Sequence, residues 1–144
     1  MAAIDAMTVR VVSVRPDDEV RVAIARMLEE NVGSVAVCDE ARIVGIFTER
    51  DVLRLAGEGG SFHEIRVGDV MTRNLYIAEP DDDLATIARL MQEKRVRHVP
   101  VVQGENLLGI LGIREVLRNL LERVWSSHDA NARDTARTLL TRGD

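Results

Sequence analysis

The feature that most constrains this chain is an internal duplication. At an offset of 64 residues, Asp5–Arg54 aligns with Asp69–Arg118 without a gap. The identical pairs include Met7/Met71, Thr8/Thr72, Pro16/Pro80, Asp17/Asp81, Met27/Met91, Val35/Val99, Gly45/Gly109 and Arg50/Arg114. One copy is only about 50 residues long and buries too little apolar surface to fold alone. The two copies are therefore expected to pack against each other as a pseudo-symmetric pair.

Each copy predicts the same order of elements, β-α-β-β-α. The first copy has a β-branched run at 11–14 that a proline ends, and strand-like runs at 34–38 and 43–47 whose polar connection suits a hairpin. Its first helix has apolar residues at i, i+3, i+4, i+7 and i+8, a face that must be buried: Val20, Ala23, Ile24, Met27 and Leu28. Its second helix is expected from Thr48 through Leu55.

The second copy repeats this order. The expected elements are a strand at 75–78, a helix carrying Leu84, Ile87, Ala88 and Met91, strands near 98–102 and 107–111, and a final helix. That final helix is longer than its counterpart, and its apolar stripe comprises Ile113, Val116, Leu117, Leu120, Leu121 and Val124, continued by Ala132, Ala136 and Leu139. Two interpretations are open: the stripe covers another subunit, or it folds back on its own core.

These patterns predict a mixed α/β (α+β) fold in which two β-α-β-β-α repeats pack through their sheets. The expected boundaries are repeat one at 4–56, a linker at 57–67, repeat two at 68–122 and a C-terminal helical tail at 123–144. Gly57, Gly59, Gly60 and Ser61 indicate that the linker is a flexible loop.

Composition argues against several classes of function. The formal net charge of −5 argues against a sequence-independent grip on nucleic acid, which needs concentrated Lys and Arg. Cys38 is the single cysteine, so the chain has no intrachain disulfide and fits a reducing, cytoplasmic setting. No apolar run approaches the roughly 20 residues that span a bilayer, and the layout of a signal peptide is missing. We therefore expect a cytoplasmic protein with neither nucleic-acid nor membrane partners.

Neither a catalytic site nor a metal site is predicted. The sequence has no Ser-His-Asp ordering and no glycine-rich phosphate loop with its lysine, so we do not expect an enzyme. The histidines have no second His, Cys or carboxylate at ligand spacing, so we expect no metal ion. No cofactor is expected to be required.

The motif at the centre of each copy is a strand that runs into a helix. It is GIFTERDVLR at Gly45–Arg54 and GILGIREVLR at Gly109–Arg118. A helix N-terminus can bind phosphate because its first N–H groups have no intrahelical partner and carry the positive end of the dipole. Thr48-x-x-Asp51 also has the pattern of a capping box, which stabilises a helix by about 1 kcal/mol without any ligand. Capping and ligand binding are both open at this point.

Together these motifs resemble the cystathionine-β-synthase (CBS) domain. The resemblance rests on DxMT at Asp5–Thr8 and Asp69–Thr72, HVPVV at His98–Val102, GIFTERD at 45–51 and their duplication, and it covers residues 4–122. It implies a CBS pair, or Bateman module, of the small stand-alone bacterial type. Such a module is expected to be regulatory, to bind an adenosine ligand (AMP, ADP, ATP, NAD(H) or S-adenosylmethionine) between its repeats, and to form a disc-like homodimer.

The resemblance also assigns residues to two unequal clefts, each with a Thr/Ser-x-x-Asp motif from one repeat and strand residues from the other. The first cleft is expected to comprise Thr48, Arg50, Asp51, Thr72, Arg73, Asn74, Leu75, Val96, Arg97, His98 and Pro100. There the carboxylate would hold two ribose hydroxyls, and Arg97 and His98 would face the phosphate. A surface position at the start of a strand is the alternative for His98.

The second, weaker cleft is expected to comprise Thr8, Val32, Gly33, Ser34, Gly112 and Glu115. Gly112 has lost the hydroxyl, and Glu115 is one methylene longer than Asp. Because Gly33 and Ser34 bring no cation, this cleft is expected to be empty, weak or suited to a less charged ligand.

The function expected from these features is a module that senses adenine nucleotides (AMP, ADP, ATP or NAD(H)) on behalf of an unidentified regulated protein. The alternative is a ligand-independent dimerisation or scaffold module whose clefts are vestigial. The intact Thr48-x-x-Asp51 favours the first, and the altered motif at Gly112 and Glu115 favours the second.

Overall fold

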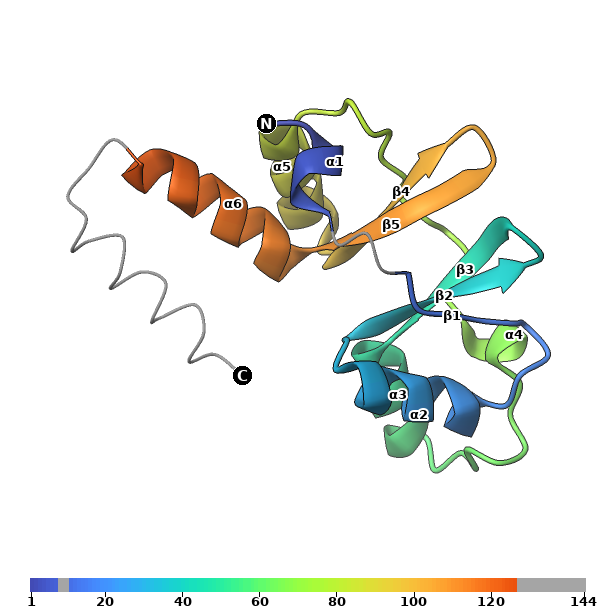
Figure 1. The fold of residues 1–144 in the computed structure, drawn as a ribbon. Helices are drawn as coiled ribbons and strands as arrows, with labels where there is room; N and C mark the ends of the chain where they lie inside the picture. Colours follow the sequence, from blue (N-terminus) through green and yellow to red (C-terminus); the bar gives the residue numbers. More distant parts are fainter. Residues whose placement is uncertain (8–10, 127–144) are drawn as a thin grey trace.

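The computed structural model describes residues 1–7 and 11–126. It contains two small sheets with helices packed on them (Figure 1). The first sheet has the strand order β1-β2-β3, and the second consists of β4 and β5. The mixed α/β (α+β) fold of two repeats predicted from the duplication is therefore confirmed.

The first repeat follows the predicted order of elements. Strand β1 (Ser13–Val14) pairs in parallel with β2 (Ser34–Asp39), and β2 pairs antiparallel with β3 (Arg42–Thr48) to form the expected hairpin. The helices are α2 (Val20–Glu30) and α3 (Glu49–Gly57). The core between sheet and helices holds Val20, Ala23, Met27, Val35, Val37, Phe47 and Leu55.

One residue of the predicted apolar face of α2 is not buried. Val20, Ala23 and Met27 lie in the core, but the side chain of Leu28 is 78% exposed, so the prediction was wrong there. The equivalent residue of the second copy is Gln92, which is polar. The buried face of this helix, and of its equivalent in the second copy, is therefore the narrower set of positions that is apolar in both copies.

The second repeat has the predicted helices and hairpin. Helix α5 (Leu84–Lys94) precedes the antiparallel strands β4 (His98–Gln103) and β5 (Asn106–Gly112), and α6 (Ile113–Trp125) follows them. Its core holds Leu84, Ile87, Met91, Val99, Val101, Leu111 and Val116.

The strand predicted at 75–78 does not form and is reduced to an isolated bridge at Ala78. In the first repeat, the Ala36 N–H donates a hydrogen bond to the Val12 carbonyl at 2.9 Å. The residue equivalent to Ala36 is Pro100, which has no N–H, so the corresponding bond is impossible. Ala78 itself still donates to the Pro100 carbonyl at 2.8 Å.

Two short helices are exchanged between the repeats. Helix α1 (Ala3–Ala6) precedes the first repeat, yet it buries Ala3 and Ala6 in the core of the second. Helix α4 (Val67–Val70) precedes the second repeat, yet it buries Val67 in the core of the first. Figure 1 shows α1 beside α5 and α4 beside the first sheet. Each repeat is therefore completed by a segment that leads into the other.

The predicted linker at 57–67 lies against the first repeat. The Val20 N–H donates to the Ile65 carbonyl at 2.9 Å, and the Arg21 N–H donates to the Phe62 carbonyl at 3.1 Å. The side chains of Phe62 and Ile65 also pack against the first core. The linker is thus packed on the first repeat at Phe62 and Ile65, and the flexibility expected of its glycine-rich part stays a prediction.

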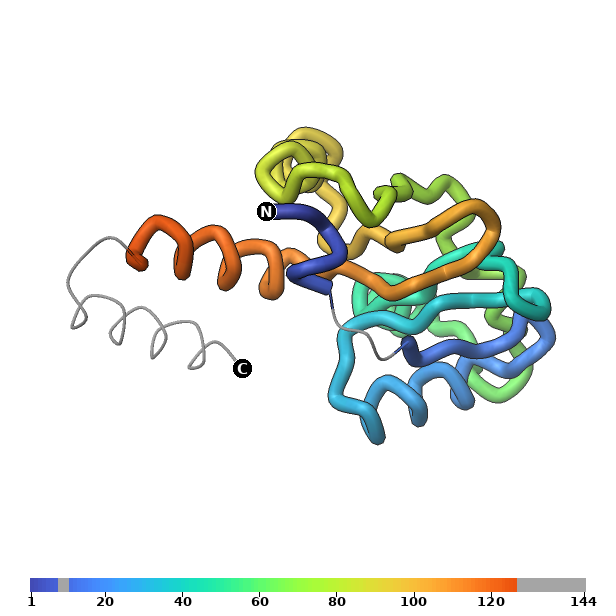
Figure 2. Tube along the Cα trace, turned by 45° about the horizontal axis from the view of Figure 1, so that its top comes forward, coloured from blue at the N-terminus to red at the C-terminus, as the bar shows by residue number. Residues whose placement is uncertain are grey.

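The two sheets meet through β3 and β5, and α6 extends away from them (Figures 1 and 2). Of the stripe on α6, Val116 is buried and Leu120 packs on the second core, while Leu117 and Val124 are exposed. The rest of the predicted tail, from 127 onward, lies outside the described residues. Within the described part of the chain, no helix has the length and hydropathy needed to cross a membrane.

Candidate functional site

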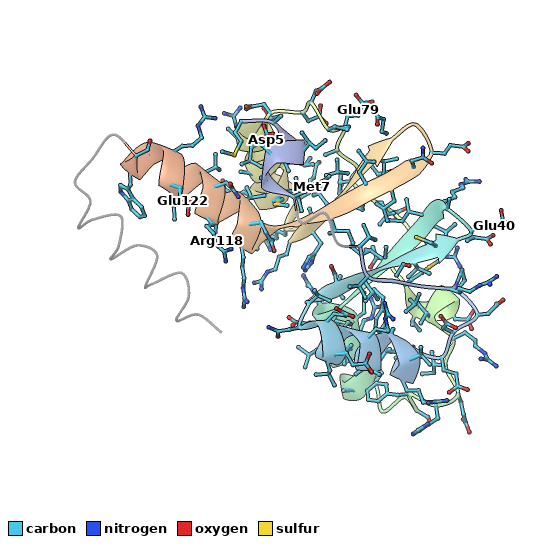
Figure 3. The ribbon with its side chains drawn as sticks, viewed as in Figure 1. Asp5, Met7, Glu40, Glu79, Arg118 and Glu122 are labelled. Atoms are coloured by element: carbon cyan, nitrogen blue, oxygen red, sulfur yellow. The ribbon has the colours of Figure 1, made fainter. Side chains whose placement is uncertain are left out.

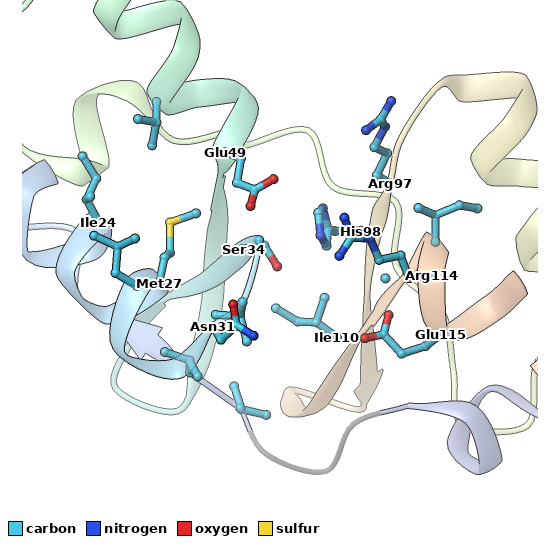
Figure 4. Close-up of a pocket in the computed structure, with 18 residues that line it drawn as sticks. Ile24, Met27, Asn31, Ser34, Glu49, Arg97, His98, Ile110, Arg114 and Glu115 are labelled. Atoms are coloured by element: carbon cyan, nitrogen blue, oxygen red, sulfur yellow. The ribbon is translucent and has the colours of Figure 1, made fainter. Parts of the chain in front are cut away.

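A cavity of about 470 Å³ lies where the two repeats meet. Its polar lining comprises Asn31, Gly33, Ser34 and Glu49 from the first repeat and Arg97, His98, Gly112, Arg114 and Glu115 from the second. Its apolar lining includes Ile24, Met27, Val32, Val52 and Ile110. Figure 4 shows Glu49 and Ser34 of the first repeat facing His98, Arg114 and Glu115 of the second across this space.

The cavity is lined by equivalent segments of the two copies. Gly33 corresponds to Arg97 at the offset of 64 residues, and Ser34 corresponds to His98. The first amide of α3, on Glu49, donates to the Gly33 carbonyl at 3.0 Å. The first amide of α6, on Ile113, donates to the Arg97 carbonyl at 2.8 Å. Each helix N-terminus is thus anchored to the start of its own strand, and both face the cavity.

Two carboxylates contribute to the cavity, one from each helix N-terminus. The Glu49 carboxylate lies over Gly33, where an added Cβ would approach it to 3.4 Å. The Glu115 carboxylate lies over Gly112, in the space that a side chain at position 112 would need. The extra methylene of Glu115 therefore lets the acid fill the place of the lost hydroxyl.

Arg97 and Arg114 line the same cavity as these two acids, together with His98 (Figure 4). Burial lowers the pKa of His98 from its ordinary value of 6.5, and the nearby Arg97 lowers it further. Glu115 and Glu49 oppose this effect. Because burial has the larger effect, His98 is a neutral imidazole at neutral pH.

The Thr48-x-x-Asp51 motif forms a capping box at the start of α3. The Thr48 N–H donates to Oδ2 of Asp51 at 2.9 Å, and the Thr48 hydroxyl donates to the same oxygen at 3.2 Å. Asp51 is only 4% exposed. The capping interpretation is thus confirmed, and neither residue lines the cavity.

The other residues expected in the first cleft lie in different surroundings. Thr72 forms an antiparallel bridge with Ile46 on β3, and Arg73 donates to the Gly68 carbonyl at 2.7 Å. Arg50 and Asn74 are exposed and Leu75 is half-buried. Val96 packs on the second core, and Pro100 is fully buried in β4.

The cavity joins parts that the sequence assigned to separate clefts. Val32, Gly33, Ser34, Gly112 and Glu115 of the second cleft line it together with Arg97 and His98 of the first. Thr8 lies outside the described residues. Gly33 and Ser34 themselves bring no cation, as expected from their side chains, but Arg97 and Arg114 line the same cavity.

Glu49 and Arg114 line the cavity but were not predicted from the sequence as site residues. Both lie at the start of a helix, between the first and last positions of the Thr-x-x-Asp pattern or of its altered copy. The signal that could have found them is the duplication itself, because helix starts equivalent in the two copies meet at the interface that relates the copies. Among the described residues, no group of three or more His, Cys, Asp or Glu side chains is arranged to hold a metal ion.

A family profile decides what this arrangement is. The profile described as CBS domain matches residues 2–58 and 67–122. The chain belongs to the CBS domain family. Its two repeats form a CBS pair, and the cavity lies between the two CBS domains.

Similar proteins agree with this membership. The CBS domain-containing protein CBSX3, mitochondrial, of Arabidopsis thaliana is 34% identical over 108 residues, which cover 71% of this chain and 52% of the relative. The chain thus spans about half the length of that relative.

Solved CBS structures share the fold. A putative signal-transduction protein with CBS domains from Burkholderia ambifaria MC40-6 has a TM-score of 0.80 at 29% identity, covering 84% of this chain and 94% of that one. CBSX2 in complex with AMP has a TM-score of 0.73 at 30% identity, covering 84% of this chain and 96% of that one.

Proposed function

We propose that this CBS pair is a regulatory module that binds an adenine nucleotide, AMP, ADP, ATP or NAD(H), between its two repeats and is not itself an enzyme. The observation that carries the proposal is the cavity of about 470 Å³, whose lining combines the cations Arg97 and Arg114 with apolar side chains. This volume lies within the range of small-molecule sites, about 300–1,000 Å³. The similar structure of CBSX2 with AMP supports the choice of ligand class.

The chemistry of the lining suits a nucleotide. Arg97 and Arg114 supply charge-assisted donors for phosphate oxygens. Ile24, Val52 and Ile110 offer apolar surface on which an adenine ring can lie. A phosphate near His98 would favour the protonated imidazole, so the histidine would add a third donor when the anion binds.

The ribose is assigned to a carboxylate of a helix start. In the first cleft expected from the sequence this group is Asp51, which forms the Thr-x-x-Asp motif with Thr48 and lies outside the cavity. In the second it is Glu115, which already lies in the cavity. A carboxylate suits this role because it accepts hydrogen bonds from two neighbouring hydroxyls.

Regulation requires that the nucleotide bind one arrangement of the repeats better than another. A ligand held between the two repeats meets this requirement, because its contacts depend on how the repeats lie. Coupling energies of about 1–3 kcal/mol are typical for such effects. The protein that responds to the change is unidentified.

We also propose that the module is a homodimer. Leu53 on α3 and Leu117 on α6 occupy equivalent positions of the two copies, and their side chains are 74% and 43% exposed. Large apolar side chains that recur on the surface in this way are suited to covering by a second copy. Sedimentation of wild type and of Leu53→Glu tests this, and a wild-type monomer would contradict it.

The proposed function is tested by calorimetry and thermal melting with AMP, ATP and NAD⁺, using protein cleared of co-purified nucleotide. At least one nucleotide is expected to give saturable heat and a higher melting temperature. Arg97→Met is expected to weaken binding by about tenfold to a hundredfold, the loss of a charged hydrogen bond. Arg89→Met on the exposed surface of α5 is the matched control and is expected to bind as wild type does.

The outcome separates this function from its rival. If no nucleotide of the panel produces heat or a melting shift, the scaffold module with vestigial clefts is the better description. If nucleotides bind but Asp51→Asn and Glu115→Gln leave the affinity unchanged, the assignment of the ribose is wrong while the ligand class stands.

A further inference from the structure

Asp51 is a buried acid whose two carboxylate oxygens already have partners. Oδ2 accepts hydrogen bonds from the backbone and the hydroxyl of Thr48, at 2.9 and 3.2 Å. Oδ1 accepts from Nη2 of Arg54 at 3.1 Å. The side chain of Asp51 is only 6% exposed, whereas that of Arg54 is 54% exposed. The guanidinium is thus the outer member of the pair.

Arg54 also reaches a second element. The same Nη2 donates to the Val70 carbonyl at 3.2 Å. Val70 is the last residue of α4, and Thr72, two residues later, bridges to Ile46 on β3. One nitrogen therefore holds the acid of α3 and the end of α4 together, beside the segment Thr72–Leu75 that belongs to the expected first cleft.

We propose that Arg54 gates Asp51, so that a ribose hydroxyl reaches Oδ1 of Asp51 only after the guanidinium has left it. This inference rests on the proposed function, because it supposes that a ribose-containing ligand uses Asp51. With Arg54 in place the Asp51 side chain is only 6% exposed, so an incoming hydroxyl must take the place of the guanidinium at Oδ1.

The displacement is feasible because Arg54 is half in solvent. An ion pair with one exposed partner is weak, since water solvates the released guanidinium. Asp51 keeps its capping bonds through Oδ2 when Oδ1 changes partner. The exchange therefore leaves no buried charge without a hydrogen bond.

The second copy supplies a matched comparison. Arg118 corresponds to Arg54, and Glu115 corresponds to Asp51. Arg118 is exposed on α6 (Figure 3). Within the described residues, no hydrogen bond or ion pair joins Arg118 to Glu115, whose carboxylate lies over Gly112 instead. The gate is thus a property of the first copy alone.

The test measures binding of AMP and of its 2′,3′-dideoxy analogue to wild type, Arg54→Met and Arg118→Met by calorimetry. Arg54→Met removes the competing donor and is expected to bind AMP about threefold to tenfold more tightly than wild type, the range set by a weak ion pair. The dideoxy analogue, which has no ribose hydroxyls, is expected to bind wild type and Arg54→Met equally. Arg118→Met is expected to bind both ligands as wild type does.

The inference is overturned if Arg54→Met binds AMP no more tightly than wild type, or if the dideoxy analogue gains affinity to the same extent. The second result would mean that Arg54 acts on the structure and not on the ribose. Arg54→Gln, which keeps an amide donor for the Val70 carbonyl, gives the same comparison if Arg54→Met does not fold. If AMP binds to none of these proteins, the proposed function fails, and the gate fails with it.

Discussion

Gly45 on β3 allows a close approach that a side chain would prevent. An added Cβ would lie 2.8 Å from Cγ of Met71 and 3.1 Å from the Thr72 carbonyl oxygen, and closer still to Sδ of Met71. Neither neighbour is free to move away. Met71 is 8% exposed and belongs to the first core, and the Thr72 carbonyl accepts from the Ile46 N–H at 3.0 Å.

Gly45→Ala is therefore expected to destabilise the protein by overpacking, at a cost of about 1–3 kcal/mol. Each kcal/mol lowers the melting temperature of a chain of this size by roughly 2–4 °C. The expected fall is thus about 2–12 °C. Calorimetric melting measures it, and urea unfolding gives the free energy independently.

Gly57→Ala is the matched control for this prediction. Gly57 is the last residue of α3, and an added Cβ there meets nothing within 4 Å. Alanine at such a site is expected to raise the free energy of unfolding by about 0.4–1 kcal/mol, because it restricts the unfolded chain. The same substitution thus has opposite signs at the two positions. If Gly45→Ala melts at or above the wild-type temperature, the close approach of α4 to β3 does not require glycine.

Three further predictions test the site and the core. Because burial lowers the pKa of His98, the folded state binds this proton less tightly than the unfolded chain, so stability is lost as pH falls below 6.5. The loss of melting temperature between neutral and acidic pH should be smaller in His98→Gln, and equal losses would contradict this. Met91→Ala at a buried site should cost about 2–5 kcal/mol in urea unfolding, whereas Leu28→Ala at an exposed site should stay within about 0.5 kcal/mol. Similar losses for Met91→Ala and Leu28→Ala would contradict the burial of Met91 and the exposure of Leu28. Thr48→Ala should cost about 0.5–2 kcal/mol through the lost cap, and an unchanged urea midpoint would contradict that role.

The predictions from sequence succeeded where the physics is local. The periodicity around Val20 and Leu84 predicted both long helices, because a helix facing a core must repeat its apolar side chains every three or four residues. The capping box at Thr48 was visible because its two members are three residues apart. The strand at 75–78 was predicted from its composition, and it failed because Pro100 on the partner strand lacks the donor it needs.

Several residues of the candidate site could be predicted from the sequence, but not that they line one cavity. Gly33, Ser34, Arg97, His98 and Glu115 were all selected from the sequence, but they were divided between two clefts. Equivalent segments of a duplicated chain converge where the copies meet, and the sequence does not say which side of each segment faces that junction.

The amino-acid sequence by itself determined the duplication, the two long helices and the hairpin of each copy and the cap at Thr48, since these depend on local patterns of residues. Only the tertiary structure decided that α1 completes the second core and α4 the first. It also decided that Arg97 lines the same cavity as Gly33, and that Arg54 pairs with Asp51 while reaching Val70. The reason is physical: these contacts join segments of separate elements, and their approach is set by how whole helices and sheets pack, not by local propensity.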